Sequence, residues 1–192
     1  MTTDPGLGFA EPALDGQANF RGLLDAMARP GTIHELTALP ADADVRSGLA
    51  LTLFDHDTPI WLDGGAAALK HRLAFHCGCP FTDRSDLAMF ALLTEGTALR
   101  GLDRFCLGDP EYPDRSTTVI CELPGLSGGP ELRLSGPGIN GQRTFAPLGL
   151  PEGFPAEWAA NGARYPLGVD LILTSGTALA ALPRTCQIEE VG

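Results

Sequence analysis

The spacing of apolar residues near the start of the chain predicts an amphipathic helix from Gly16 or Gln17 to Ala28. Asp15 stands where a side chain can cap the first turn, and Arg29-Pro30-Gly31 ends the helix. Large apolar side chains recur at intervals of three and four residues, which places them on one face. They are Phe20, Leu23, Leu24 and Met27.

Residues 1–14 are rich in proline and glycine and predict a loop or an arm laid over the surface. A second helix is expected over residues 43–54, and shorter helices over 66–73 and 154–163. In the second helix the expected inward-facing residues are Val45, Leu49, Leu53 and Phe54.

Short runs rich in β-branched and other apolar residues predict six strands. They cover residues 32–36, 59–62, 87–92, 117–123, 131–134 and 169–174. Residues 73–77 are expected to be extended, and residues 99–105 a short helical or irregular connection. Helices and strands alternate early and strands dominate late, which is typical of a mixed sheet covered by helices, a three-layer α/β/α arrangement. A length of 192 residues favours one domain spanning residues 1–192.

Charge and composition narrow the class of function. The net charge of −11 argues against general binding to nucleic acid or to an anionic membrane surface. No apolar run is long enough to span a membrane. Residues 1–5 lack the basic start and apolar core of a signal peptide, so a cytoplasmic protein is expected. Lys70 is the single lysine, which leaves little scope for a Schiff base with pyridoxal phosphate.

A glycine-rich loop at Ser135–Gly141 resembles a dinucleotide-binding fingerprint when it is taken literally as Gly136-x-Gly138-x-x-Gly141. That fingerprint requires a strand before it and a helix opening on its last glycine. Pro147 and Pro151 leave too little room for the helix, so the dinucleotide interpretation is rejected. The glycines are expected to form a tight turn close to other backbone or to a partner.

Three further motif matches fail for similar reasons. Gly125-x-Ser127-x-Gly129 matches a nucleophile elbow, but Pro130 and a strand follow where that motif needs a helix. His34-Glu35 begins like a zinc-protease motif, yet position 38 is alanine. Lys70 is followed by His71, so there is no phosphate-binding P-loop.

Two histidine-containing segments invite a metal or acid–base hypothesis. His71 and His76 lie near the Cys77-Gly78-Cys79 pair, although no second cysteine pair stands at zinc spacing. Buried or half-buried thiols are the favoured explanation of the pair, because free cysteine behaves as a small apolar residue. Asp55-His56-Asp57-Thr58 is explained by turn chemistry before a strand. The five cysteines are not expected to form disulfides.

Charged residues in two elements have specific expected partners. Gln17, Arg21 and Asp25 form a polar stripe on the first helix, where Arg21 can pair with Asp25 or contact an anion or a partner. Asp170 lies within an apolar strand, where a carboxylate is costly unless it is paired. Arg184 is its natural partner.

Four phrases in order along the chain resemble the PhnH family, a subunit of the bacterial carbon–phosphorus lyase system that degrades phosphonates. The resemblance covers nearly the whole chain. The phrases are Gln17-Ala-Asn-Phe-Arg21 with Ala26-Met-Ala-Arg-Pro-Gly31, Leu51-Thr-Leu-Phe-Asp-His-Asp-Thr-Pro-Ile-Trp-Leu62, Leu134-Ser-Gly-Pro-Gly-Ile139, and Tyr165-Pro-Leu-Gly-Val-Asp170 with Leu182-Pro-Arg-Thr185.

The resemblance implies an α/β fold similar to that of pyridoxal-phosphate-dependent transferases, but without that cofactor. It implies a homodimer when isolated and a core assembly with subunits G, I and J. With these partners a family member supports attachment of a phosphonate to C1 of the ribose of ATP, which displaces adenine and gives a ribose 1-phosphonate 5-triphosphate. Subunit J later breaks the carbon–phosphorus bond.

The residues themselves show no complete catalytic site, so a structural or co-catalytic role is expected. Two alternatives remain open: a free-standing enzyme or binding protein for a small anion, using backbone N–H groups and arginines, and a metalloprotein using His71, His76, Cys77 and Cys79. No cofactor and no metal are expected. The candidate ligand- or partner-binding residues are Gln17, Arg21, Ser135, Gly136, Gly138, Asp170 and Arg184.

Overall fold

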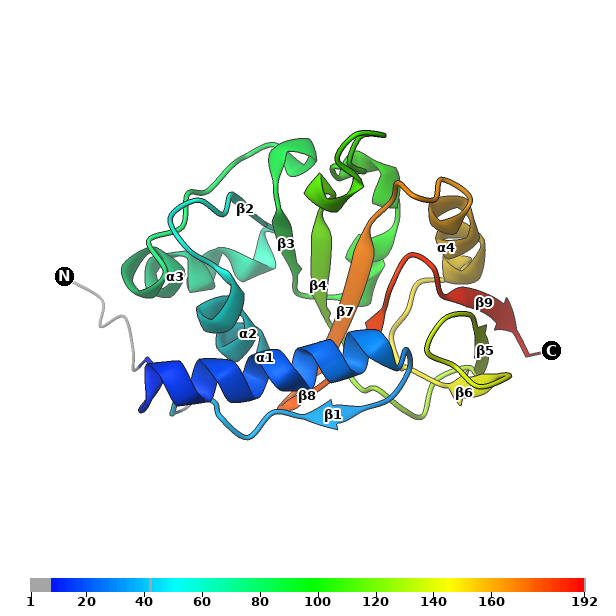
Figure 1. The fold of residues 1–192 in the computed structure, drawn as a ribbon, viewed down its shortest axis with the longest axis horizontal. Helices are drawn as coiled ribbons and strands as arrows, with labels where there is room; N and C mark the ends of the chain where they lie inside the picture. Colours follow the sequence, from blue (N-terminus) through cyan, green and yellow to red (C-terminus); the bar gives the residue numbers. More distant parts are fainter. Residues whose placement is uncertain (1–7, 42, 192) are drawn as a thin grey trace.

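The computed structural model describes residues 8–41 and 43–191 and shows a mixed α/β fold (Figure 1). Its larger sheet has the strand order β1-β8-β7-β4-β3-β2. The four neighbouring strands β7, β4, β3 and β2 run parallel to one another, whereas β8 is antiparallel to both of its neighbours, β1 and β7. The predicted mixed sheet is therefore confirmed. Its strands are β1 (His34–Glu35), β2 (Ile60–Leu62), β3 (Phe90–Leu93), β4 (Thr118–Glu122), β7 (Asp170–Ser175) and β8 (Ala178–Leu182).

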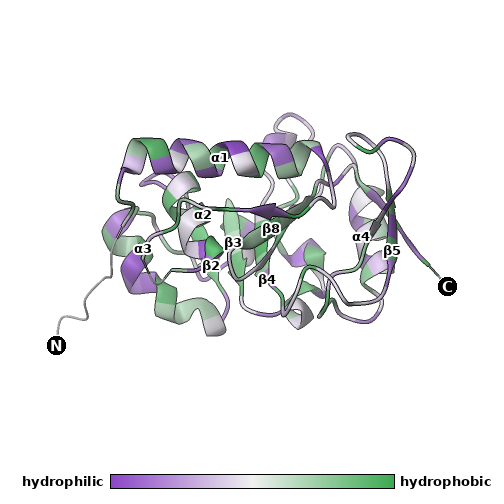
Figure 2. Cartoon of the chain, turned by 90° about the horizontal axis from the view of Figure 1, so that it is seen from below, coloured by the Kyte–Doolittle hydropathy of each residue, from purple (hydrophilic) through white to green (hydrophobic). Residues whose placement is uncertain are grey.

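Two apolar cores lie on opposite faces of this sheet because alternate residues of each strand point to opposite sides. Ile120 of β4 belongs to the core beneath α1 (Pro12–Ala28), α2 (Val45–Leu53) and α3 (Lys70–His76). Its neighbours Val119 and Cys121 belong to the other core, which contains Phe154 and Trp158 of α4 (Phe154–Gly162). Figure 2 shows α1 and α2 covering one side of the sheet.

A second, antiparallel sheet of order β6-β5-β9 packs into the core on the α4 side. It consists of β5 (Leu132–Ser135), β6 (Arg143–Phe145) and β9 (Gln187–Glu190). β5 agrees with the predicted strand, whereas β6 and β9 lie in segments for which no strand is predicted. Leu132 and Leu134 point inward, and Arg133 and Ser135 between them are only partly buried, so β5 alternates as a half-buried strand should.

The first helix begins earlier than predicted. Pro12 occupies its first turn, where the missing N–H is unimportant, so the proline starts the helix instead of excluding it. Residues 12–14 are thus helical and do not belong to an arm, and Asp15 lies inside the helix with its carboxylate accepting a hydrogen bond from the Glu11 N–H at 2.9 Å. The prediction for residues 1–7 lies outside the described residues.

The buried face of α1 also differs from the predicted one. Asn19, Leu23 and Ala26 are buried, whereas Phe20 and Leu24 are 45% and 50% exposed. Small and polar residues occupy the inward stripe because α1 lies close to the next segments, and the Asn19 amide donates to the Ala38 carbonyl at 2.7 Å. Leu23 and Met27 do pack on the core as predicted, whereas side-chain size misplaced Phe20 and Leu24.

Two other predictions need adjustment, and a third is confirmed. α3 extends from Lys70 to His76, so residues 73–77 are not extended. Ser85–Leu87 forms a 3-10 helix and β3 begins at Phe90, later than expected. The connection at residues 99–105 contains the 3-10 helix Leu102–Arg104.

None of the helices in residues 8–41 and 43–191 has the length and apolar character needed to cross a bilayer.

The start of α2 is fixed by Asp44. Its carboxylate accepts hydrogen bonds from the Ser47 backbone N–H at 2.9 Å and from the Ser47 hydroxyl at 3.0 Å, and it pairs with Arg46. Burial by itself would raise the pKa of Asp44, but these hydrogen bonds and the Arg46 charge hold that pKa below its usual value.

Asp44→Ala is expected to lower the free energy of unfolding by about 1–2 kcal/mol near neutral pH, as other losses of a helix N-cap do. Because the pKa is lower in the folded state, the contribution is present above the unfolded pKa of about 4 and is lost as the pH falls through the folded pKa. Thermal melts of wild type and variant should therefore converge in acid. Asp83→Ala, at an exposed carboxylate, is the control, and a gap that is independent of pH would contradict the assignment.

Candidate functional site

The glycine loop after β5 packs against the end of α1 and against the segment before β9. Gly136 has a φ of +121°, and a Cβ there would lie 2.9 Å from the Thr185 carbonyl oxygen. Gly138 has a φ of +82°, and a Cβ there would overlap the Ala28 carbonyl oxygen. Both positions therefore need glycine for close backbone approach as well as for the left-handed conformation.

Gly141 differs from the other two glycines of the loop. Its φ is +75°, but a Cβ there would meet no atom within 4 Å. The loop leads into β6 instead of a helix, which confirms the rejection of the dinucleotide fingerprint. The Ser135 hydroxyl lies 3.5 Å from the Gln187 side-chain oxygen in β9, so this residue faces the neighbouring strand.

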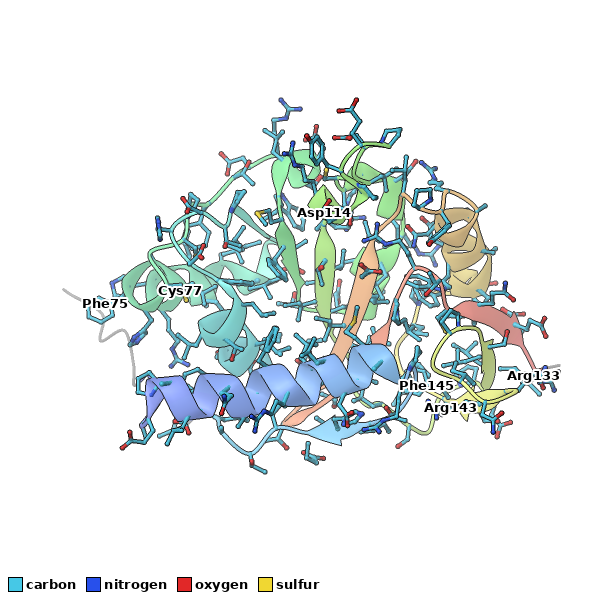
Figure 3. The ribbon with its side chains drawn as sticks, viewed as in Figure 1. Phe75, Cys77, Asp114, Arg133, Arg143 and Phe145 are labelled. Atoms are coloured by element: carbon cyan, nitrogen blue, oxygen red, sulfur yellow. The ribbon has the colours of Figure 1, made fainter. Side chains whose placement is uncertain are left out.

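Arg143 of β6 also connects the small sheet to the end of α1, although the sequence pattern did not identify this residue. Its guanidinium donates to the carbonyl oxygens of Arg29 at 3.2 Å and Pro30 at 2.6 Å, just beyond the end of α1. Figure 3 shows Arg143 between α1 and the loop of the small sheet. A cation at a helix C-terminus also interacts favourably with the helix dipole.

Asp170 and Arg184 form the ion pair that the sequence predicts. The Arg184 Nη2 lies 2.6 Å from Asp170 Oδ2, and its Nε lies 3.1 Å from Oδ1. The Arg184 backbone N–H also donates to Oδ1 at 2.8 Å. The Arg184 and Asp170 side chains are 12% and 18% exposed. The carboxylate at the start of the apolar strand β7 is therefore paired in a mostly buried position.

The remaining Arg184 donors bind two other segments. Nη1 donates to the carbonyl oxygens of Pro113 and Pro166, both at 3.1 Å, and Nη2 donates to the Ser116 hydroxyl. A guanidinium has five N–H donors, and all five are used by this protein's own acceptors. Arg184 therefore clamps the start of β7 to the loops around Pro113 and Pro166, and its guanidinium has no donor left for an anion.

A groove of about 660 Å³ lies beside this clamp, between α4 and the segment that forms β9. Pro137 of the glycine loop, Tyr165, Arg184 and Thr185 all line it, so two of the four phrases meet here. Tyr165 is 66% exposed. The candidate site thus lies near the amino-terminal ends of the parallel strands, because Asp170 is the first residue of β7.

Gln17 and Arg21 lie on the exposed side of α1. Arg21 lines a different, shallow hollow of about 550 Å³ along α1. Asp25 pairs with Arg29, and its carboxylate lies 3.7 Å from His34 Nδ1. The expected Arg21–Asp25 ion pair is therefore wrong, and the structure does not bring Arg21 into the groove that Arg184 lines.

Polar side chains at the opposite ends of the parallel strands bind one another. Arg46 Nε lies 3.2 Å from Glu122 at the end of β4, and the Thr174 hydroxyl donates to Glu122 at 2.7 Å. Asp63, after β2, accepts from the Thr94 backbone N–H at 2.7 Å. Ligands of open α/β sheets usually bind at these carboxyl ends, but here the described side chains satisfy each other.

The histidine and cysteine cluster does not assemble into a metal site. In residues 8–41 and 43–191, no three or more His, Cys, Asp or Glu side chains are grouped to hold a metal ion. Burial, with a smaller effect of Cys79, raises the pKa of Cys77 to about 12, and burial raises the pKa of Cys79. Both thiols therefore stay protonated near neutral pH, which favours their role as small buried residues.

Comparisons with known proteins give a consistent family assignment. A family model described as bacterial phosphonate metabolism protein (PhnH) matches residues 7–189. A protein of Rhizobium meliloti, the alpha-D-ribose 1-methylphosphonate 5-triphosphate synthase subunit PhnH, is 46% identical over 187 residues, which is 94% of each chain. A putative C-P lyase subunit protein, HtxG of Stutzerimonas stutzeri, is 37% identical over 92% of this chain and 87% of its own.

Asp170→Ala is expected to lower the free energy of unfolding by about 3 kcal/mol or more, because it leaves the Arg184 charge unpaired in a mostly buried position. Asp25→Ala is the matched control, since its ion pair with Arg29 is about half exposed and should contribute less than about 1 kcal/mol. Urea unfolding of both variants measures the difference. Equal losses of unfolding free energy in the two variants would mean that the Asp170–Arg184 ion pair stabilises the fold no more than the exposed Asp25–Arg29 pair does.

Gly138→Ala and Gly141→Ala separate conformational strain from close packing. Each places an alanine at a positive φ, which costs about 1–2 kcal/mol. Gly138→Ala should lower the Tm further, because its methyl group would overlap the Ala28 carbonyl. Thermal melts under one set of conditions test this, and the interpretation is rejected if the two variants melt together.

Proposed function

This chain belongs to the PhnH family of bacterial phosphonate metabolism proteins, and we propose on that basis that it is a subunit of a carbon–phosphorus lyase core complex. The proposed role is in formation of a ribose 1-alkylphosphonate 5-triphosphate from ATP and an alkylphosphonate, with release of adenine. The observation that carries the proposal is the 46% identity with a synthase subunit across 94% of both chains.

The geometry supports a structural or co-catalytic role within that complex. Residues of the phrases that identify the family mainly take part in internal packing. Gly138 packs against the carbonyl at the end of α1, and all five N–H donors of the Arg184 guanidinium bind acceptors within the protein. The groove between α4 and β9 is lined in part by Tyr165, whose side chain is exposed to solvent. These features favour a chain that presents a rigid surface to partners over one that binds an anion through Arg184.

We propose subunits G, I and J as the partners, a homodimer for the isolated chain, and the cytoplasm as the location. We also propose that the fold is similar to that of pyridoxal-phosphate-dependent transferases without use of the cofactor. Two features support this last point: helices cover a mixed sheet, and Lys70 is an exposed residue whose Nζ lies 5.2 Å from the centre of the Phe81 ring.

Reconstitution of the synthase reaction tests the proposal. The other subunits alone should release no adenine from ATP and methylphosphonate, and addition of this purified chain should restore the release. The isolated chain should show no heat of binding with either ATP or methylphosphonate in isothermal titration.

A heat of binding for the isolated chain would instead favour the alternative role, a free-standing protein for a small anion. Arg21→Ala then distinguishes the two hollows, since Arg21 lies outside the groove beside Arg184. Full adenine release by the partner subunits without this chain would contradict its assignment as a required subunit.

A further inference from the structure

A further hollow, of about 480 Å³, lies where the start of β5 and the end of β9 meet the start of α4. At this end of the ladder the Val191 N–H donates to the Glu131 carbonyl at 3.3 Å. Figure 1 shows the three elements together at one end of the molecule. The hollow is separate from the groove that Arg184 lines, and none of the candidate residues predicted from the sequence lines it.

The walls of this hollow are rigid and largely apolar. Two of its lining residues, Leu132 and Phe154, are only 5% and 1% exposed, and Leu150 and Val191 add further apolar surface. Four prolines also line it, and each has a φ fixed by its ring, so we call it the proline hollow. They are Pro130, Pro147, Pro151 and Pro155. A preformed apolar wall of this kind suits the apolar part of a ligand.

The charged residues of the proline hollow all have the same sign. Glu131, Glu152 and Glu190 line it and are exposed, whereas no lysine, arginine or histidine among the described residues does. Within residues 8–41 and 43–191, none of these three carboxylates has a cationic partner. Three unpaired negative charges beside one hollow attract a cation and repel an anion.

The start of α4 does not reverse this preference. A helix N-terminus attracts anions through its free N–H groups, but the Phe154 N–H donates to the Pro151 carbonyl at 3.1 Å and Pro155 has no N–H. The Ala156 N–H donates to the Gly153 carbonyl at 3.1 Å. These first positions of α4 therefore offer no N–H group to an anion, and the three carboxylates determine which charge the hollow accepts.

We propose that the proline hollow receives a lysine or arginine side chain of a partner subunit. This rests on the proposed assembly function. The aliphatic stem of such a side chain packs on the apolar walls while its charged head reaches the carboxylates in contact with solvent. Charge complementarity selects this occupant, because an acidic or purely apolar segment would leave all three carboxylates without a partner in the interface.

Replacement of the three carboxylates by amides tests this contact. The variant that combines Glu131→Gln, Glu152→Gln and Glu190→Gln keeps side-chain size and removes the charges. Affinity of the full chain for the other purified subunits should fall about tenfold or more, since a hydrogen bond to a charged group corresponds to at least that factor. Wild-type affinity should also decrease more steeply with added salt than that of the variant. Unchanged melting of the isolated variant establishes that it folds.

A matched control changes the net charge by the same amount elsewhere. It combines Asp83→Asn, Glu111→Gln and Asp114→Asn, at exposed carboxylates that lie outside the hollow. Figure 3 places Asp114 far from Arg133, the residue next to Leu132 of the hollow. The control should bind the subunits like wild type. Equal losses in the two triple variants would show a general effect of net charge and overturn the proposal.

Two small probes test the charge preference on the isolated full chain. n-Butylguanidinium carries the head group of arginine on an alkyl stem, and n-butylphosphonate carries an anion on the same stem. At millimolar concentration the first should shift the amide NMR signals of Leu150, Glu152 and Val191 in wild type and less so in the triple glutamine variant. n-Butylphosphonate should not shift them. The reverse preference, or no shift with n-butylguanidinium, would overturn the proposal.

A photoreactive residue at Val191 identifies the occupant in the assembled complex, and mass spectrometry should locate the cross-link beside a lysine or arginine of another subunit. A cross-link to a second copy of this chain, or wild-type affinity of the triple glutamine variant, would overturn the docking site while leaving the assembly role intact. If wild-type protein binds none of the subunits, the assembly role falls, and the docking site falls with it.

Discussion

The structure depends most on one guanidinium, that of Arg184, which sits at the start of the central parallel strands. Its partners come from three separate segments: Asp170 on β7, the loop from Pro113 to Ser116, and Pro166. A buried cation of this kind is stable only when every donor is matched. The clamp therefore fixes where β7 begins, and with it one wall of the groove between α4 and β9.

Part of this arrangement could be predicted because its cause is local. A lone carboxylate in an apolar strand needs a partner, and that requirement was enough to pair Asp170 with Arg184. Apolar runs likewise located β4 and β7 to within a residue or two. The inward face of α1 could not be predicted in this way, because Asn19 and Ala26 are buried for close packing and not for their apolar area.

The rest of the candidate site depends on contacts between distant segments. Arg143 binds carbonyl groups more than a hundred residues earlier in the chain, and Gly138 is required only because Ala28 lies against it. β9 becomes a strand by pairing with β5, and its own sequence of Gln187 to Glu190 has little strand propensity. Such features follow from tertiary structure, which local sequence patterns do not encode.

The position of β8 has a consequence for the order in which the chain can mature. β1 pairs only with β8 in the large sheet, and α1 packs over Leu179 and Ala181 of that same strand. During synthesis α1 can pack early against α2, but β1 and the part of α1 that faces β8 must wait for almost the whole chain before their apolar surface is covered. Long-range pairing of this kind slows folding and leaves such surface exposed in the meantime, so the nascent amino-terminal segment is a natural client for a chaperone.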